Sequence, residues 1–330
     1  MGQLYAAFGS SHSIMLAATP EDWVGAFRES DRKMPLFDKT GMPRNYDELL
    51  AVAPSDSAGM VTPEKMLAAH KRTFRAVADL KRHIEATDLD ALVVIGDDQH
   101  ELFQDSMMPS LAIFYGETIR NAPRAAVAKS DWYRRAQQER LEPEREAYYP
   151  VHGGLALHLI EGLAANGFEA CSVRAIPADQ HEGHAFSYIH RTYLGDRALP
   201  IVPVMLNTYY PPNQMTPKRC VELGLRLKDV IQSYPAELRV AVLASGGLSH
   251  FVVDEDLDRG VIEAMRTNHL DHLAALDPKR LQAGSSEIRS WIVTAAAASA
   301  ANLDLKWIEY IPAYRTPALT GTGLAFARWG

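Results

Sequence analysis

The chain has 330 residues, of which 47% are hydrophobic and 23% charged, a composition that suits a globular protein with a large core. Its formal net charge of -7 argues against a nucleic-acid-binding protein, because such proteins need a clustered basic face that this sequence lacks. The two cysteines, Cys171 and Cys220, are far apart, so we expect neither a disulfide framework nor a thiolate zinc site. The partner expected from these properties is a small molecule.

The sequence also argues against a membrane protein. No segment approaches the roughly 18 consecutive apolar residues that a membrane-spanning helix needs. The first residues, MGQLYAAFGSSH, lack the basic region and the long apolar region of a secretory signal. We therefore expect a cytoplasmic protein in a reducing compartment.

Apolar runs of strand length recur along the chain and alternate with amphipathic segments of helical period. The predicted strands lie at 4–9, 91–96, 110–116, 169–176, 199–206, 238–245 and 306–312. The predicted helices lie at 63–87, 155–167, 218–234 and 286–302. Strands that are apolar on both faces, with helices between them, predict an α/β layered sheet with helices on both faces, built as one large domain over residues 1–330.

Two stretches depart from this alternation. Residues 17–62 are rich in Pro, Asp and Gly, and we expect them to form a helical and irregular insertion after the first strand. Residues 117–150 are charged and aromatic, and we expect them to cover the mouth of a functional site.

Side chains that bind metals or transfer protons follow several of the predicted strands. His12 follows the first strand, Gln99 and His100 follow the strand at 91–96, and Glu287 opens the last helix. A ferrous site that binds both an organic chelate and dioxygen needs few protein ligands, and two imidazoles with one carboxylate leave positions open. The sequence thus predicts a metal site with His12, Glu287 and either His100 or Gln99.

Two further histidines are candidates for proton transfer. His250 follows a predicted strand through the turn GGLS, and His184 lies in the segment EGHAF. An imidazole has an ordinary pKa near 6.5 and can take a proton from a phenolic hydroxyl and return it at neutral pH. Either histidine is a candidate for the base.

Structural explanations compete with each of these assignments. Glu287 can be explained as a helix-capping residue that complements the helix dipole. The GGLS segment can be an ordinary tight turn. Asp97 and Asp98 can be explained as solvated loop charges.

Five segments, in collinear order, resemble the class III extradiol dioxygenases. They are SSHSIML, EGHAF, LPIVPVMLNTYYPPNQMTPKRCVELG, ASGGLSHF and SEIRSWI, and the likeness covers most of the chain outside 17–75. The resemblance implies a non-haem Fe(II) enzyme that opens a catecholic ring beside its diol and incorporates both atoms of O₂. It implies that His12 and Glu287 are iron ligands, that His250 is the acid/base and that His184 is an oxygen-pocket or proton-relay residue.

The chain departs from the family at the second iron ligand. Where relatives have a histidine after Asp, this chain has DDQHELF, and an alignment without a gap places Gln99 at the ligand position. We expect His100 to be the ligand, because imidazole binds iron much better than a neutral amide, although a shift of one residue reverses the direction of a side chain.

The resemblance also implies a carboxylated, lignin-derived substrate such as gallate, 3-O-methylgallate or protocatechuate. The expected pocket residues are Asn207, Tyr209, Tyr210, Tyr314 and Arg315. Among them, Arg315 suits a carboxylate. We also expect a homo-oligomer. Two alternatives stay open: a binding or redox-regulatory protein on the same fold, and a zinc-dependent hydrolase.

Overall fold

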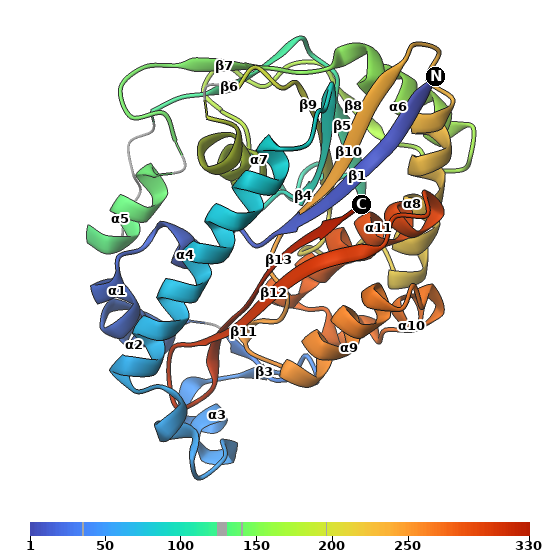
Figure 1. Ribbon diagram of the computed structural model, residues 1–330. Helices are drawn as coiled ribbons and strands as arrows, with labels where there is room; N and C mark the ends of the chain where they lie inside the picture. The colour runs from blue at the N-terminus through green and yellow to red at the C-terminus, as the bar shows by residue number, and fades with distance from the viewer. Residues whose placement is uncertain (35, 124–130, 140, 196) are drawn as a thin grey trace.

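The computed structural model describes residues 1–34, 36–123, 131–139, 141–195 and 197–330. Its centre is a mixed nine-stranded sheet with helices packed on both faces (Figure 1). This architecture confirms the predicted α/β class. No helix among the described residues is long and apolar enough to cross a membrane.

The strand order in the central sheet is β11-β13-β1-β10-β4-β9-β5-β8, and β12 pairs with β13. These strands are β1 (Gly2–Ser10), β4 (Ala91–Asp97), β5 (Leu111–Phe114), β8 (Cys171–Val173), β9 (Ile201–Leu206), β10 (Leu238–Ser245), β11 (His250–Val252), β12 (Leu305–Tyr314) and β13 (Thr320–Trp329).

Four adjacent strands, β1, β10, β4 and β9, run parallel through the middle of the sheet. Residues 91–97 of β4 are all buried, as expected for a strand covered on both faces. The carboxyl ends of parallel strands meet at one edge, where ligand sites of open α/β sheets form. The segments that follow these four strands therefore come together.

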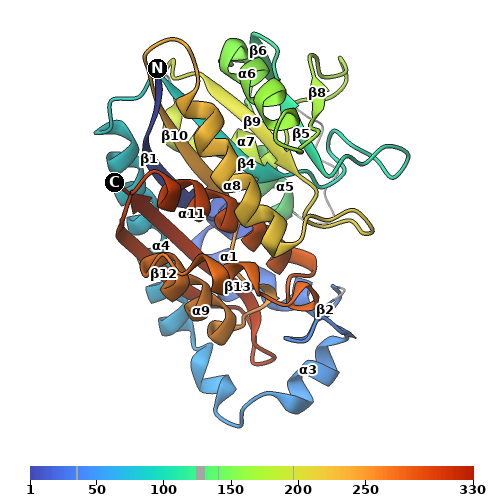
Figure 2. The same cartoon turned by 90° about the vertical axis from the view of Figure 1, so that its right-hand side faces the viewer.

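The helices form two layers. One face carries α6 (Gly153–Ala164), α8 (Pro217–Gln232), α9 (Glu255–Arg266), α10 (Leu270–Ala274) and α11 (Ile288–Ala300). The other face carries α1 (Pro20–Val24), α2 (Ala26–Asp31), α4 (Pro63–Glu85) and α7 (His184–Ile189). Figure 2 shows α8 and α11 in front of the sheet and α4 behind it.

Residues 17–62 leave the sheet after β1 and return through α4. After α1 and α2 they form a short hairpin of β2 (Leu36–Phe37) and β3 (Pro43–Arg44), and then α3 (Tyr46–Val52). In Figure 1, α3 lies at the lower end of the molecule. Leu36 and Tyr46 pack against Val252, beside the predicted base His250. The insertion therefore reaches the surroundings of His250.

Within residues 117–150, β6 (Thr118–Asn121) pairs with β7 (Ala147–Pro150), and α5 (Asp131–Gln138) lies between them in the chain. α5 packs against the short helix at 14–17, directly after His12. Residues 124–130 and 140 lie outside the described residues. That this segment covers the site stays a prediction.

The packing of α8 on α11 depends on Gly224. A β-carbon at this position would lie 2.3 Å from the carbonyl oxygen of Val293 and 2.7 Å from the β-carbon of Ala296. We expect Gly224→Ala to lower the free energy of unfolding by about 1–3 kcal/mol, because the backbone of α11 must move away. Thermal unfolding measures this loss. Gly59→Ala is the control, since a β-carbon at position 59 would meet nothing within 4 Å, and equal melting temperatures for the two variants would contradict the prediction.

Candidate metal centre and active site

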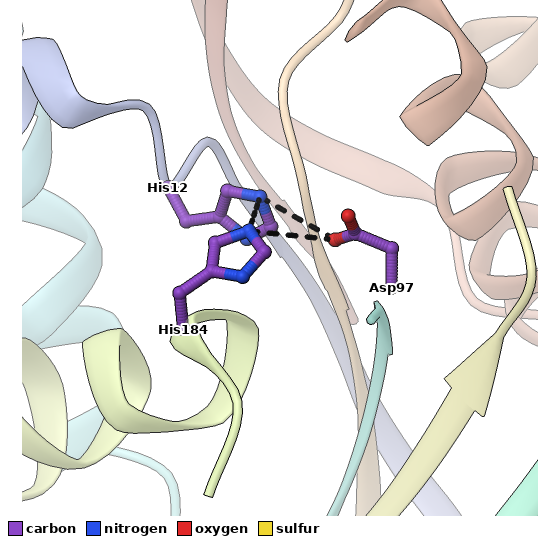
Figure 3. A group of neighbouring side chains, drawn as sticks. All are labelled: His12, Asp97 and His184. Carbon is purple, nitrogen blue, oxygen red and sulfur yellow. Dashed lines mark hydrogen bonds and ion pairs between the residues drawn. The ribbon is translucent and has the colours of Figure 1, made fainter. Parts of the chain in front are cut away.

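Three potential metal ligands meet at the carboxyl edge of the parallel strands: His12, Asp97 and His184. His12 follows β1 by two residues, Asp97 is the last residue of β4, and His184 is the first residue of α7. Their ligand atoms all lie within 4.8 Å of one another. In Figure 3 both imidazole rings point toward the carboxylate of Asp97.

His12 Nε2 is at the centre of this group. It lies 3.2 Å from His184 Nε2, 3.3 Å from Glu287 Oε2 and 3.5 Å from Asp97 Oδ1. Glu287 is the last residue of the short helix at Ala283–Glu287 and leads into α11. The side chains of His12, Asp97 and Glu287 are at most 3% exposed, so water screens their charges little.

The hydrogen bonds around the two imidazoles determine which nitrogen faces the centre. Ser245 Oγ donates to the carbonyl of Ala185 at 2.7 Å, so it accepts from His12 Nδ1 at 3.0 Å. His184 Nδ1 lies 2.7 Å from the carboxylate of Glu101, which also accepts the backbone N–H of His184 at 2.9 Å. Both Nδ1 atoms therefore carry the proton, and both Nε2 atoms present lone pairs to the same point. Such orientation by outer hydrogen bonds is typical of metal-binding histidines.

Two lone pairs 3.2 Å apart repel each other unless a cation lies between them. The buried carboxylates are a second reason to expect a cation here. Among the described residues, Oδ1 of Asp97 has no hydrogen-bond partner although it is buried. A divalent ion between the two Nε2 atoms and the carboxylates would compensate this buried negative charge. The donor set of imidazoles and carboxylates suits Fe(II) and Zn(II).

The two carboxylates differ in their electrostatic surroundings. Burial raises the pKa of Asp97. Burial also acts to raise the pKa of Glu287, but His250 and His12 outweigh it and hold that pKa well below its ordinary value. Glu287 is thus the carboxylate that stays charged in this arrangement.

Glu287 is held in place by contacts from two segments, the turn at 246–250 and Tyr209. Gly247 N–H donates to Oε2 at 2.6 Å, and Tyr209 Oη donates to Oε1 at 3.0 Å. His250 Nε2 lies 3.2 Å from Oε1. The turn between β10 and β11 approaches closely, since a β-carbon at Gly246 would lie 2.9 Å from the β-carbon of Glu287.

His250 has a rigid environment. Its Nδ1 donates to the carbonyl of Leu248 at 2.7 Å, and its backbone N–H donates to Ser285 Oγ at 3.0 Å. Its Nε2 lies 3.2 Å from Glu287 Oε1, so both ring nitrogens lie beside acceptors. Burial acts to lower the pKa of His250, but the neighbouring Glu287 outweighs it and raises that pKa. Nε2 is the ring nitrogen that can exchange a proton with a bound molecule, because Nδ1 is hydrogen-bonded to the carbonyl of Leu248.

The turn that carries His250 is anchored by Asp258 of α9. Ser249 donates to this carboxylate twice, from its backbone N–H at 2.8 Å and from its hydroxyl at 2.7 Å. Burial raises the pKa of Asp258 to about 6. A buried carboxylate that receives such hydrogen bonds restricts the movement of the residues bound to it.

The structure places Gln99, and not His100, at the cluster. Gln99 Nε2 lies 3.0 Å from Asp97 Oδ2, 3.4 Å from His184 Nε2 and 3.5 Å from Glu287 Oε1. His100 instead stacks on Tyr210 at a centroid distance of 3.8 Å, and its Nε2 lies 3.0 Å from Asp105 Oδ1. Both residues lie beyond the end of β4, and His100 has a left-handed backbone with φ of 61°, so the two neighbouring side chains point in different directions.

The predicted pocket residues are only partly brought to the site. Tyr209 contacts Glu287, and Tyr210 stacks on His100. Asn207 stabilises the turn in which it lies, because its Nδ2 donates to Tyr210 O at 2.6 Å and to Asn213 Oδ1 at 2.7 Å.

Tyr314 and Arg315, the other two predicted pocket residues, have partners outside the cluster. Tyr314 donates its hydroxyl to Glu255 at 2.7 Å. Arg315 forms a buried ion pair, in which its Nε donates to Asp31 Oδ2 at 2.9 Å. This pair joins the insertion to the β12–β13 turn and neutralises the charge that had suggested a carboxylate site.

Sequence reasoning missed Asp97 and Glu101. The interpretation of Asp97 and Asp98 as solvated loop charges is wrong, since their exposed fractions are 0% and 4%. The available signal was the position of Asp97 directly after a fully apolar strand, where a carboxylate reaches the sheet edge. Glu101 gave no comparable signal, because its partner His184 is distant in the sequence.

The residues converge on a site of the kind that belongs to metal-dependent enzymes of α/β fold. Residues 60–325 match the family model described as the catalytic LigB subunit of aromatic ring-opening dioxygenase. The protein belongs to this family, which confirms the resemblance found in the motifs. The matched range contains Asp97, His184, His250 and Glu287, whereas His12 precedes it.

A curated relative is a gallate dioxygenase of Pseudomonas putida. The two proteins are 30% identical over 184 residues, which is 52% of this chain and 51% of the relative. The chain therefore spans about half the length of the curated relative it matches.

Proposed function

We propose that the protein is a non-haem Fe(II)-dependent extradiol dioxygenase that opens a carboxylated catecholic ring with O₂. The main support is the convergence of two oriented imidazoles and two buried carboxylates at one point, in a chain of the ring-opening dioxygenase family. A ferrous ion at this point would offer adjacent open positions for the two catechol oxygens and for O₂.

The residues that would hold the iron are His12, His184 and Glu287, with Asp97 beside them. His12 and Glu287 keep the roles that the sequence suggested. We propose His184 in place of His100 as the second imidazole ligand. His184 Nε2 is 3.2 Å from His12 Nε2, whereas His100 is paired with Asp105. His184 is thereby proposed as a ligand and not as a proton relay.

His250 is proposed as the acid/base, on the geometry of its ring. Its Nδ1 donates to Leu248 O, so in the neutral ring Nε2 carries the lone pair that can take a phenolic proton, and Glu287, 3.2 Å away, stabilises the imidazolium that forms until the proton is returned. In the overall reaction the carbon–carbon bond beside the diol breaks, and both atoms of O₂ enter the ring-opened product. Tyr209 would keep Glu287 in place through its hydroxyl.

Gallate, protocatechuate and 3-O-methylgallate are the proposed substrate class, supported by the gallate dioxygenase relative. Tyr209 contacts Glu287 and Tyr210 stacks on His100, and both remain proposed as substrate contacts. Asn207 is proposed to act through the turn that carries these two tyrosines. Tyr314 and Arg315 are proposed as supports of the pocket wall, because their polar groups bind Glu255 and Asp31.

The proposal is tested by loading the protein with Fe(II) without oxygen and then adding O₂ with catechol, protocatechuate, gallate or 3-O-methylgallate. We expect one O₂ consumed per ring opened, with a yellow ring-fission product from at least one carboxylated substrate. Zinc retained tightly with no oxygen uptake would favour the hydrolase instead. Failure to bind any metal would favour the binding protein.

A further inference from the structure

A second group of polar side chains is buried close to His184 in the chain. Glu182 and Asn121 are 0% exposed, and His190 is 1% exposed. Glu182 Oε1 accepts from Asn121 Nδ2 at 2.9 Å, and Glu182 Oε2 accepts from His190 Nδ1 at 2.7 Å. Burying a carboxylate costs free energy even when it is paired, and apolar side chains of similar volume would fill the same space without that cost. The group therefore points to a role beyond packing.

Glu182 is also fixed through its main chain. Its N–H donates to the carbonyl of Arg120 at 2.8 Å, and its carbonyl accepts from His181 Nδ1 at 2.6 Å. The segment at 174–183 contains no helix or strand, so its path depends on contacts of this kind. Because His184 comes two residues after Glu182, these bonds determine where the backbone of His184 lies.

The pair of Glu182 and His190 spans the helix that begins with His184. Glu182 precedes α7 by two residues, and His190 opens the π-helical turn His190–Leu194 that follows it. A helix of six residues is too short to be stable by itself, so its position depends on contacts outside it. Glu101 orients the ring of His184, whereas Glu182 and His190 hold the helix that carries this ring.

The same group connects α7 to the β6–β7 ribbon, which lies above α7 in Figure 1. Asn121 belongs to β6, and Tyr149 of β7 stacks on the ring of His190 with the centroids 4.0 Å apart. α5, which lies between β6 and β7 in the chain, packs against the short helix directly after His12. The segment at 117–150 therefore contacts the elements that carry both imidazoles of the cluster.

We propose that Glu182 is a positioning residue of the metal centre, which through His190 and Asn121 holds α7 so that His184 Nε2 stays in place for a metal ion. The inference rests on the proposed function, because it takes His184 as a metal ligand. Glu182 itself touches neither the ion nor a substrate. Its loss should therefore weaken metal binding although every proposed ligand is still present.

Glu182→Gln is the first variant, because its amide N–H would face one of the two donors that the carboxylate now accepts. Asn121 cannot reverse its amide without losing the N–H of Glu142, which its Oδ1 accepts at 2.9 Å. His190 cannot move its proton to Nε2 without burying an unpaired donor, since Nε2 has no hydrogen-bond partner among the described residues. We expect the affinity for Fe(II) to fall roughly tenfold, the smaller effect usual for residues that orient metal ligands.

Two substitutions of His190 separate positioning from packing. His190→Asn keeps an N–H donor near the place of Nδ1, whereas His190→Leu keeps apolar volume without a donor. Both lose the stacking on Tyr149. We expect His190→Leu to weaken Fe(II) binding about as much as Glu182→Gln, and His190→Asn to stay within about threefold of the unmodified protein. Affinity is measured by anaerobic titration against a chelator, and the absorption spectrum of the Co(II)-loaded protein reports the geometry of the ligands.

Leu163→Ala is the control for lost stability, because Leu163 is buried in α6 on the other face of the sheet. It should lower the melting temperature and leave the Fe(II) affinity and the Co(II) spectrum unchanged. An equal loss of affinity in Leu163→Ala, or in His190→Asn and His190→Leu alike, would refute the positioning role. If Glu182→Gln does not fold, the two variants of His190 decide the question.

The remaining outcomes separate this inference from the function on which it depends. Unchanged affinity and spectrum in Glu182→Gln and His190→Leu, whatever their melting temperatures, would refute the inference and leave the proposed function in place. If the unmodified protein binds no metal, or if His184→Ala binds it equally well, the proposed ligand set is refuted and the inference falls with it.

Discussion

Replacing His184 by alanine is expected to lower the affinity for Fe(II) at least about 100-fold. Loss of residues that only orient metal ligands costs about 10–100-fold, so loss of an imidazole ligand should cost no less. His184 Nε2 is 3.2 Å from His12 Nε2, and Glu101 holds its other nitrogen at 2.7 Å, so no other side chain replaces it without rearrangement. Metal affinity is measured by anaerobic titration with competition from a chelator of known affinity.

His100→Ala is the matched control, because it removes an imidazole from the neighbouring surface without touching the cluster. We expect its metal affinity to stay within about threefold of the unmodified protein. Thermal unfolding of both apo-proteins shows whether either substitution disturbs the fold. Retention of metal by His184→Ala together with its loss in His100→Ala would return the ligand role to His100.

Replacing His250 by asparagine is expected to leave metal binding within about threefold and to lower turnover about 100-fold to 10,000-fold. This range is the usual contribution of one acid/base group. Asparagine fits where a larger ring does not, because a β-carbon at Gly284 would already lie 1.9 Å from Cδ2 of His250. Asparagine also keeps a polar group near Glu287 but cannot take up a proton at neutral pH.

The measurement is steady-state oxygen consumption with the metal content determined on the same samples. The metal content separates a missing acid/base from a damaged metal site. Full ring-opening activity in His250→Asn would exclude the acid/base role. A loss of metal in step with the loss of activity would show instead that His250 acts through Glu287, which lies 3.2 Å away.

The central strands were predictable from local sequence. β1, β4, β9 and β10 are continuous apolar runs, and such runs form strands buried on both faces of a parallel sheet. Residues that follow these strands must lie at the same edge of the sheet. That His12 and His250 lie near each other was therefore predictable from their positions in the sequence.

Other elements were missed because their local signals are weak. β13 contains Gly321 and Gly323 and was not predicted, since glycine disfavours strands in isolation. The strand forms because β1 and β12 pair with it on its two sides. Tertiary pairing therefore outweighed local preference.

The amino-acid sequence by itself determined the fold class, the edge at which the site lies and the family to which the chain belongs. Only the tertiary structure decided which side chains meet there: Gln99 in place of His100, the distant His184 oriented by Glu101, and the buried Asp97. It also decided that Arg315 pairs with Asp31, 284 residues away in the chain. The physical reason is that strand patterns are local, whereas the direction of one side chain and the partner of one charge depend on segments that come together only in the folded protein.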